Sequence, residues 1–253
     1  MRKVQSTPWW WAAAGVVVLF VVGTVVPLSP LAWAAGIAYL VVSSLLVSLG
    51  LRRRGATRFG AANAVTATRS MLVGVATALV VAALGGEAST LLLVSVVAVA
   101  LALDGVDGYV ARRTGSVSEL GARFDMEVDA FLLLVLSVHD ARIVGWWVLA
   151  IGLMRYAFVV VAWLVPWFGR TLPYRYWRKV VTAACGVALT LVATQLLPPA
   201  ANVLVAAAAL GLLVESFGRD VVWLIRMNRA GMDYVSPQEA LARDSDGARD
   251  ESR

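Results

Sequence analysis

Long apolar segments, separated by short polar stretches, follow one another along almost the whole chain. A helix needs ~20 mostly apolar residues to cross the hydrocarbon core of a bilayer. This pattern predicts an all-α fold, a polytopic transmembrane helical bundle. The eight expected spans are residues 9–28, 31–50, 70–86, 89–111, 118–138, 144–166, 180–197 and 201–225. The first would also suit a signal peptide, but a second apolar run follows it at once.

Composition supports a membrane protein and argues against a nucleic-acid partner. Of the 253 residues, 60% are hydrophobic and only 15% are charged, which is far less charge than a soluble domain carries. The formal net charge is +6. The basic residues separate hydrophobic segments instead of clustering on a soluble domain, so we interpret them as determinants of membrane topology.

The basic residues fall into clusters with an even number of predicted spans between them. By the positive-inside rule, both chain termini and every basic loop then lie on the cytoplasmic side of the cell membrane. Arg142 is the only arginine or lysine in the loops expected on the opposite side. The clustered residues are Arg2, Lys3, Arg52, Arg53, Arg54, Arg58, Arg112, Arg113, Arg170, Arg175, Arg178, Lys179, Arg226 and Arg229.

Four aspartates interrupt the apolar pattern near the cytoplasmic ends of the fourth and fifth predicted helices. Asp104 and Asp107 are spaced i, i+3, and Asp125 and Asp129 are spaced i, i+4, so each pair shares one helix face. We expect the two helices to be antiparallel neighbours, with all four carboxylates at a similar depth. Each buried acid costs on the order of 3 kcal/mol, so protons, arginines or cations must compensate.

Hard oxygen ligands on rigid helices suit Mg²⁺ or Mn²⁺, and Ca²⁺ is a further candidate. The cluster would then bind a dication and, through it, a phosphate-bearing ligand. Intramembrane acids also occur along ion and proton pathways, so a cation-coupled transporter is the alternative.

The residues Asp104, Asp107, Gly108, Ala111, Arg112, Gly121, Asp125 and Asp129 read D-x2-D-G-x2-A-R-x8-G-x3-D-x3-D. This pattern resembles the signature of the CDP-alcohol phosphotransferase (CDP-alcohol phosphatidyltransferase) family at all of its fixed positions. Upstream, Asn63, Thr66 and Arg69 resemble the family's N-x-x-T-x-x-R segment, although Ala62 stands where a proline is common.

The resemblance implies a reaction of phospholipid biosynthesis. A CDP-alcohol, often CDP-diacylglycerol, gives its phosphoryl group to the hydroxyl of a small polar acceptor, and CMP leaves. Carried over to this chain, Asp104, Asp107 and Asp125 would bind metal, and Asp129 would bind metal and act as general base. The residues expected around the cytidine diphosphate are Gly108, Ala111, Arg112 and Gly121.

The resemblance also divides the chain and implies a homodimer. Residues 57–229 would form the family's six-helix catalytic core, and residues 1–56 would form an extra N-terminal transmembrane pair with a basic cytoplasmic loop. Residues 230–253 are polar and acid-rich, and we interpret them as a disordered cytoplasmic tail.

Four basic residues are candidates for holding the acceptor: Lys179, Arg178, Arg175 and Arg155. In the family a basic residue near this place helps to hold the acceptor head group, and Lys179 with Thr182 after it matches best. A basic loop with interfacial aromatic anchors explains the same stretch equally well. Arg155 lies mid-membrane, where it would bind a substrate phosphate or pair with an acid elsewhere.

The other charged residues have structural interpretations. Glu127 faces away from the aspartates and is spaced for an ion pair with Arg123. Glu215 and Arg219 are spaced for an intrahelical pair. His139 is the single histidine, so a histidine-based metal site or triad within one chain is excluded.

Overall fold

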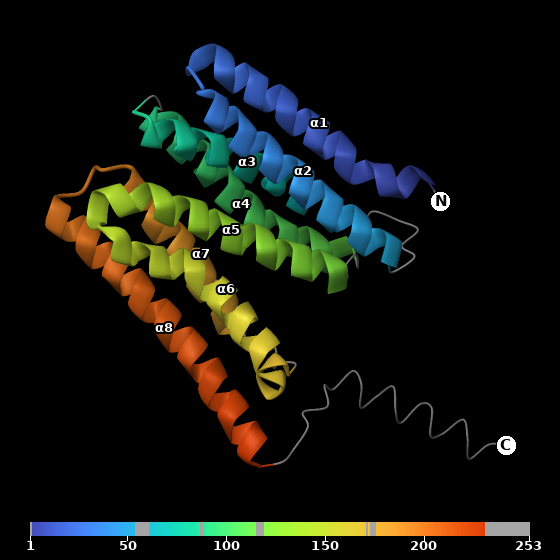
Figure 1. The fold of residues 1–253 in the computed structure, drawn as a ribbon, viewed down its shortest axis with the longest axis vertical. Helices are drawn as coiled ribbons and strands as arrows, with labels where there is room; N and C mark the ends of the chain where they lie inside the picture. Colours follow the sequence, from blue (N-terminus) through green and yellow to red (C-terminus); the bar gives the residue numbers. More distant parts are fainter. Residues whose placement is uncertain are drawn as a thin grey trace.

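The computed structural model describes residues 2–53, 61–86, 89–114, 119–170, 172 and 176–230, and all their side chains except those of residues 2–6, 61–62, 107–114 and 119–120. This part of the chain is all-α (Figure 1). Its helices are α1 (Arg2–Val25), α2 (Pro30–Arg53), α3 (Ala61–Leu84), α4 (Thr90–Thr114), α5 (Glu119–Val144), α6 (Leu149–Leu164), α7 (Tyr176–Ala193) and α8 (Pro199–Arg229), with short 3-10 turns at Trp146–Val148 and Pro166–Gly169.

The eight predicted helices are confirmed, and within the described residues six of them are long and apolar enough to cross a membrane. These six are α1, α2, α3, α6 with its preceding turn, α7 and α8. In the part of α4 whose side chains are described, the apolar stretch is the shorter Thr90–Val106. Helix α5 is not among the six, because charged side chains lie in both its first and its second half. That α4 and α5 cross the bilayer therefore stays a prediction, and so does the division into a core and an extra pair.

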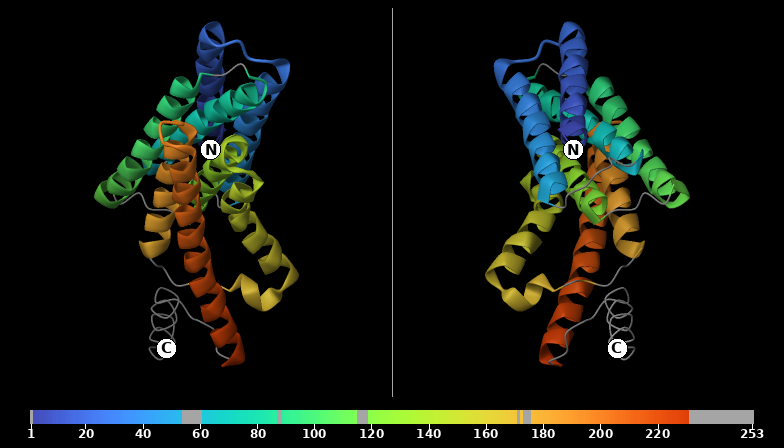
Figure 2. Two further views of the ribbon diagram at one scale, coloured as in Figure 1. Left: turned by 90° about the vertical axis from the view of Figure 1, so that its left-hand side faces the viewer. Right: turned by 90° about the vertical axis from the view of Figure 1, so that its right-hand side faces the viewer.

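Helix α3 is the central helix of the bundle. It packs against α1, α2, α4 and α5, while α7 packs against α4, α5 and α8. Helices α1 and α8 lie on opposite sides of the molecule (Figure 2). Within the described residues α4 and α5 have no extensive contact with each other, so the expectation that they are close neighbours is wrong. The helices α3 and α7 each contact both, and a side chain from α3 fills the space between the aspartates.

Glycines allow the closest helix crossings. A Cβ on Gly36 of α2 would lie 3.0 Å from the Cβ of Ala78 and 3.2 Å from the carbonyl oxygen of Gly74, both in α3. A Cβ on Gly152 of α6 would lie 2.4 Å from the Cα of Leu134 in α5. Small residues let helix backbones approach in this way in membrane bundles, where van der Waals packing drives association.

Polar side chains close several helix ends. Ser29 and Ser89 accept hydrogen bonds from the backbone amides of Ala32 and Leu92, and thereby cap α2 and α4. Arg142 donates to the carbonyl oxygens of Ala83 and Leu84, which end α3. Basic groups stabilise the C-terminal end of a helix. This contact therefore gives a structural role to Arg142, the basic residue expected on the side opposite the cytoplasm.

Successive helices alternate in direction, so the ends expected to be cytoplasmic lie toward one side of the bundle (Figure 1). The arrangement agrees with the predicted topology without placing a membrane. The polar tail predicted at residues 230–253 lies, apart from its first residue, outside the described part of the chain.

Candidate active site

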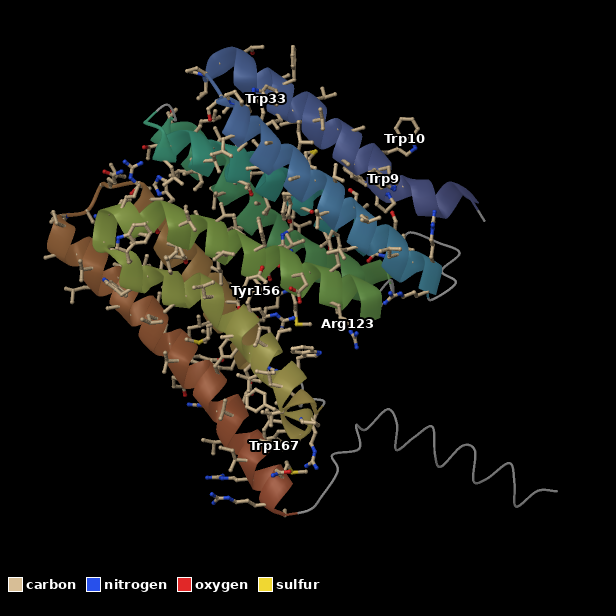
Figure 3. All side chains as sticks on the ribbon, viewed as in Figure 1. Trp9, Trp10, Trp33, Arg123, Tyr156 and Trp167 are labelled. Carbon is tan, nitrogen blue, oxygen red and sulfur yellow. The ribbon has the colours of Figure 1, made fainter. Side chains whose placement is uncertain are left out.

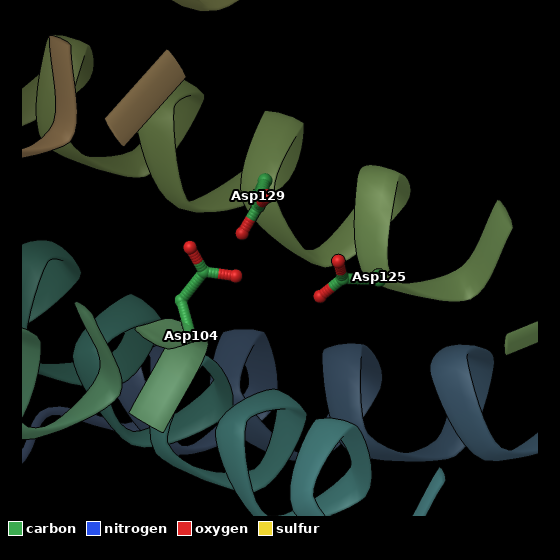
Figure 4. Close-up of side chains that lie close together, drawn as sticks. All are labelled: Asp104, Asp125 and Asp129. Carbon is green, nitrogen blue, oxygen red and sulfur yellow. The ribbon is translucent and has the colours of Figure 1, made fainter. Parts of the chain in front are cut away.

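Three of the four predicted aspartates converge. Asp104 comes from α4, and Asp125 and Asp129 come from successive turns of α5 (Figure 4). One carboxylate oxygen from each lies within 4.8 Å of the others. All three side chains are partly buried. Asp107 lies one turn after Asp104 in α4, but its side chain is outside the described set.

The side chain between the aspartates is Arg69 of α3, which is 0% exposed. Its Nη1 lies 3.1 Å from Oδ1 of Asp104 and also donates to Asp125. Its Nη2 donates to Asp129, and its Nε donates to the carbonyl oxygen of Ala100 at 3.3 Å. The planar guanidinium therefore reaches three carboxylates and one backbone group, a use of its fixed donors that lysine could not reproduce.

Lys179 is the second cation at the cluster. It lies at the start of α7, and its Nζ is 3.7 Å from Oδ1 of Asp104. Its side chain is 41% exposed, so the ammonium can meet both the cluster and a ligand from solvent. The hydroxyl of Thr182, one turn later, donates to the carbonyl oxygen of Arg178 at 3.0 Å.

A small hollow lies beside the aspartates, with a volume of about 10 Å³, which is room for about one water molecule. Its wall combines carboxylates with aliphatic side chains and a glycine, so the aspartates border the apolar interior of the bundle. The lining residues are Leu101, Asp104, Asp129, Leu132, Leu133, Thr182, Ala183 and Gly186.

The other predicted acceptor residues already have acidic partners or lie outside the description. Arg178 contacts Asp220 of α8, with 3.5 Å between Nη1 and Oδ2. Arg155 of α6 pairs with Glu127 of α5. Arg175 belongs to the undescribed stretch before α7. The basic residues of this region are therefore not equivalent, and among the contacts described for them it is Lys179 that reaches Asp104.

The partner of Glu127 differs from the one its spacing indicated. Its carboxylate accepts a hydrogen bond from Arg155 on the neighbouring helix. Glu127 is therefore the acidic partner that we expected for Arg155 if Arg155 bound no phosphate. The intrahelical pair between Arg219 and Glu215 is confirmed, and Glu215 also accepts a hydrogen bond from Trp177 Nε1 at 3.1 Å.

The four residues predicted to surround a cytidine diphosphate lie near the aspartates in sequence. Gly121 lies in the first turn of α5 and is half-buried. Gly108, Ala111 and Arg112 lie in the last turns of α4, and their surroundings are outside the described set. The part of the site that should hold the donor's nucleotide is thus only partly described.

The donor set fits a divalent cation. The described side chains bring three negative charges against the two positive charges of Arg69 and Lys179. Asp104 Oδ1 is buried and has no hydrogen bond among the described groups, despite the two nearby cations. One oxygen of each carboxylate lies within 4.8 Å of the others, so the group could hold a metal ion once the Arg69 guanidinium shifts from between the three side chains. The structure does not identify the metal.

A family model described as CDP-alcohol phosphatidyltransferase matches residues 59–214, which include the whole aspartate motif. The chain belongs to the CDP-alcohol phosphatidyltransferase family. It is an enzyme of that family, with multiple membrane helices and an aspartate triad that could hold a metal ion. No curated protein and no solved structure matches it.

Sequence reasoning missed the role of one residue in this phosphatidyltransferase. Arg69 was noted only as part of the resembling segment, although a charged residue within the apolar α3 is itself a signal of function. Its position between α4 and α5 could not be read from the sequence, because hydrophobic spacing predicts helices and not which helices become neighbours.

Proposed function

We propose that the protein transfers a phosphatidyl group from CDP-diacylglycerol to the hydroxyl of a small polar acceptor and releases CMP. The observation that carries this proposal is the convergence of Asp104, Asp125 and Asp129 from two helices on one volume. Family membership supports the reaction class, and the position of the carboxylates among long apolar helices supports a lipid donor.

The proposed step forms one bond and breaks another at a single phosphorus. The acceptor oxygen bonds to the phosphorus that carries the diacylglycerol. The bond from that phosphorus to the bridging oxygen of the pyrophosphate breaks, and CMP leaves with its electron pair. The acceptor proton passes to the carboxylate of Asp129. A carboxylate can act as this base when it lies within hydrogen-bond reach of the hydroxyl.

Asp104, Asp107, Asp125 and Asp129 would hold the divalent cation, most simply Mg²⁺ or Mn²⁺, which neutralises the charge of the pyrophosphate when bound. Arg69 then has a separate task. Its contacts to Asp104, Asp125 and Asp129 fix the three carboxylates relative to one another. Side chains that are held in place before the substrate arrives lower the barrier more than ones that must reorganise.

We propose further that the acceptor carries a phosphate, and that Lys179 binds it. Lys179 is exposed and reaches the cluster, whereas Arg178 and Arg155 already contact Asp220 and Glu127. The acceptor would enter from the cytoplasmic side, where the basic helix ends are expected to lie. Assembly as a homodimer stays a prediction.

The test uses purified protein in lipid nanodiscs with labelled CDP-diacylglycerol and paired acceptors: glycerol 3-phosphate against glycerol, and inositol phosphate against inositol. We expect release of CMP and a new lipid only with Mg²⁺ or Mn²⁺, and preferentially with the phosphorylated member of a pair. Absence of product with every acceptor, together with ion-driven flux in proteoliposomes, would favour the transporter instead.

A further inference from the structure

The helices α1 and α2 precede the residues that the family model matches, yet α2 packs tightly on the catalytic helices. A Cβ on Gly74 of α3 would lie 2.8 Å from Cδ2 of Leu40 in α2. Gly36 makes a similarly close approach to α3. The α1–α2 pair is therefore in intimate contact with the helix that carries Arg69 (Figure 1).

One side chain of α2 contacts both α3 and α5. The hydroxyl of Tyr39 lies 3.3 Å from Oγ of Ser70, the residue after Arg69. The ring of Tyr39 stacks on Phe131, two residues after Asp129, with 4.5 Å between ring centroids and 27° between planes. Tyr39 thus joins the two helices that supply the partners of the Arg69–Asp129 ion pair.

We propose that Tyr39 is a positioning residue that sets the distance and rotation of α3 relative to α5, and thereby aligns Arg69 with Asp125 and Asp129. This inference rests on the proposed function. A small rotation of either helix would move the guanidinium relative to the carboxylates, and active groups must be held within about 0.5 Å of productive geometry. The pair α1–α2 is then part of the active-site framework.

The two contacts of Tyr39 can be separated by substitution. Tyr39→Phe keeps the ring that stacks on Phe131 and removes the hydroxyl that meets Ser70. Tyr39→Leu removes both contacts. Trp33→Leu is the matched control, because Trp33 is another aromatic residue of α2 but packs on Phe20 and Gly23 of α1. Figure 3 shows it near the turn between α1 and α2.

The experiment measures three quantities for each variant in nanodiscs: Mn²⁺ affinity by electron paramagnetic resonance, kcat with the Mg²⁺ concentration for half-maximal rate, and the thermal midpoint. We expect Tyr39→Leu to weaken Mn²⁺ binding and to lower kcat by about tenfold, the size found when groups behind metal ligands are lost. Tyr39→Phe should lower Mn²⁺ affinity and kcat by less than Tyr39→Leu does. Trp33→Leu should change the thermal midpoint only.

A double-mutant cycle tests the hydroxyl contact directly. If Tyr39 and Ser70 act through each other, Tyr39→Phe, Ser70→Ala and the double variant should show equal, non-additive losses of kcat. The proposal is overturned if folded Tyr39→Leu protein matches Trp33→Leu in Mn²⁺ affinity and kcat. Inactive wild-type protein would instead refute the proposed function, and the Mn²⁺ comparison would still decide the role of Tyr39.

Discussion

The side-chain nitrogen of Lys179 lies 3.7 Å from Oδ1 of Asp104, so a cation at the start of α7 meets the aspartate cluster from the solvent side. Arg69 approaches the same oxygen from the buried side, 3.1 Å away. The two cations therefore have different surroundings: Arg69 is enclosed, whereas Lys179 can also contact a ligand. Arg69 is therefore placed to hold the three carboxylates, and Lys179 is placed to bind a ligand.

Replacing Lys179 should affect the acceptor more than the donor. For Lys179→Gln we expect the KM for a phosphorylated acceptor to rise by about tenfold or more, because a charge-assisted contact of about 1.5–3 kcal/mol is lost. The KM for CDP-diacylglycerol should change little. Steady-state kinetics with glycerol 3-phosphate and glycerol measure both effects. An equal increase in KM for the two acceptors would contradict phosphate recognition by Lys179.

Replacing Asp129 should remove the proposed base. We expect Asp129→Asn to lower kcat by about 10²–10⁴-fold, since an amide cannot accept the acceptor proton. The matched control is Glu127→Gln on the same helix, whose carboxylate pairs with Arg155 outside the cluster. Glu127 does not contact Asp104, Asp125 or Asp129 in the contacts described for it, so activity should persist. Full activity in Asp129→Asn would exclude it as the base.

Replacing Arg69 should affect stability as well as activity. Arg69→Ala leaves three carboxylates without their buried counter-charge, and removing one partner of a buried ion pair costs about 3–5 kcal/mol. Thermal unfolding in detergent should show a large drop in midpoint, partly restored by Mg²⁺. Arg69→Lys keeps the charge but cannot reach all three acids, so it should be intermediate. An unchanged midpoint for Arg69→Ala would contradict the packing described for α3.

The crossing of α5 and α6 gives a prediction that does not depend on catalysis. A Cβ at Gly152 would meet the backbone of Leu134 at 2.4 Å, and backbone atoms cannot yield as a flexible side chain can. We expect Gly152→Ala to destabilise the protein by about 1–3 kcal/mol. Gly211→Ala in α8 is the control, because nothing lies within 4 Å of its added Cβ. Similar unfolding midpoints for the two variants would argue against this close crossing.

Hydrophobic spacing was enough to predict eight helices. The spacing of the motif was enough to predict that Asp104, Asp125 and Asp129 converge. Helix neighbours were harder to predict. We expected α4 and α5 to pack side by side because a short turn joins them, but α3 and α7 contact both instead. Such contacts depend on side-chain size along each face, as at Gly36 and Gly152, and on which buried cation meets which acids.

The charged partners show the same limit. An i, i+4 spacing predicted the pair of Glu215 with Arg219, because both ends lie on one helix. The same reasoning missed the contact of Glu127 with Arg155, which joins two helices. Likewise, nothing in the spacing of Tyr39 indicated that it would touch both Ser70 and Phe131. Local pattern predicts local contacts, and contacts between helices need the packed bundle.

The enclosure of Arg69 among three aspartates also bears on how the chain enters the bilayer. Helices α4 and α5 bring acids that resist transfer from water to lipid, and α3 alone would bring an uncompensated arginine. When the three segments pack together, Arg69 of α3 has its acidic partners and offsets one of the three negative charges of Asp104, Asp125 and Asp129. If α4 and α5 cross the bilayer as predicted, insertion of α3, α4 and α5 should therefore be a joint event, in which the translocation machinery releases them to lipid as an assembled unit.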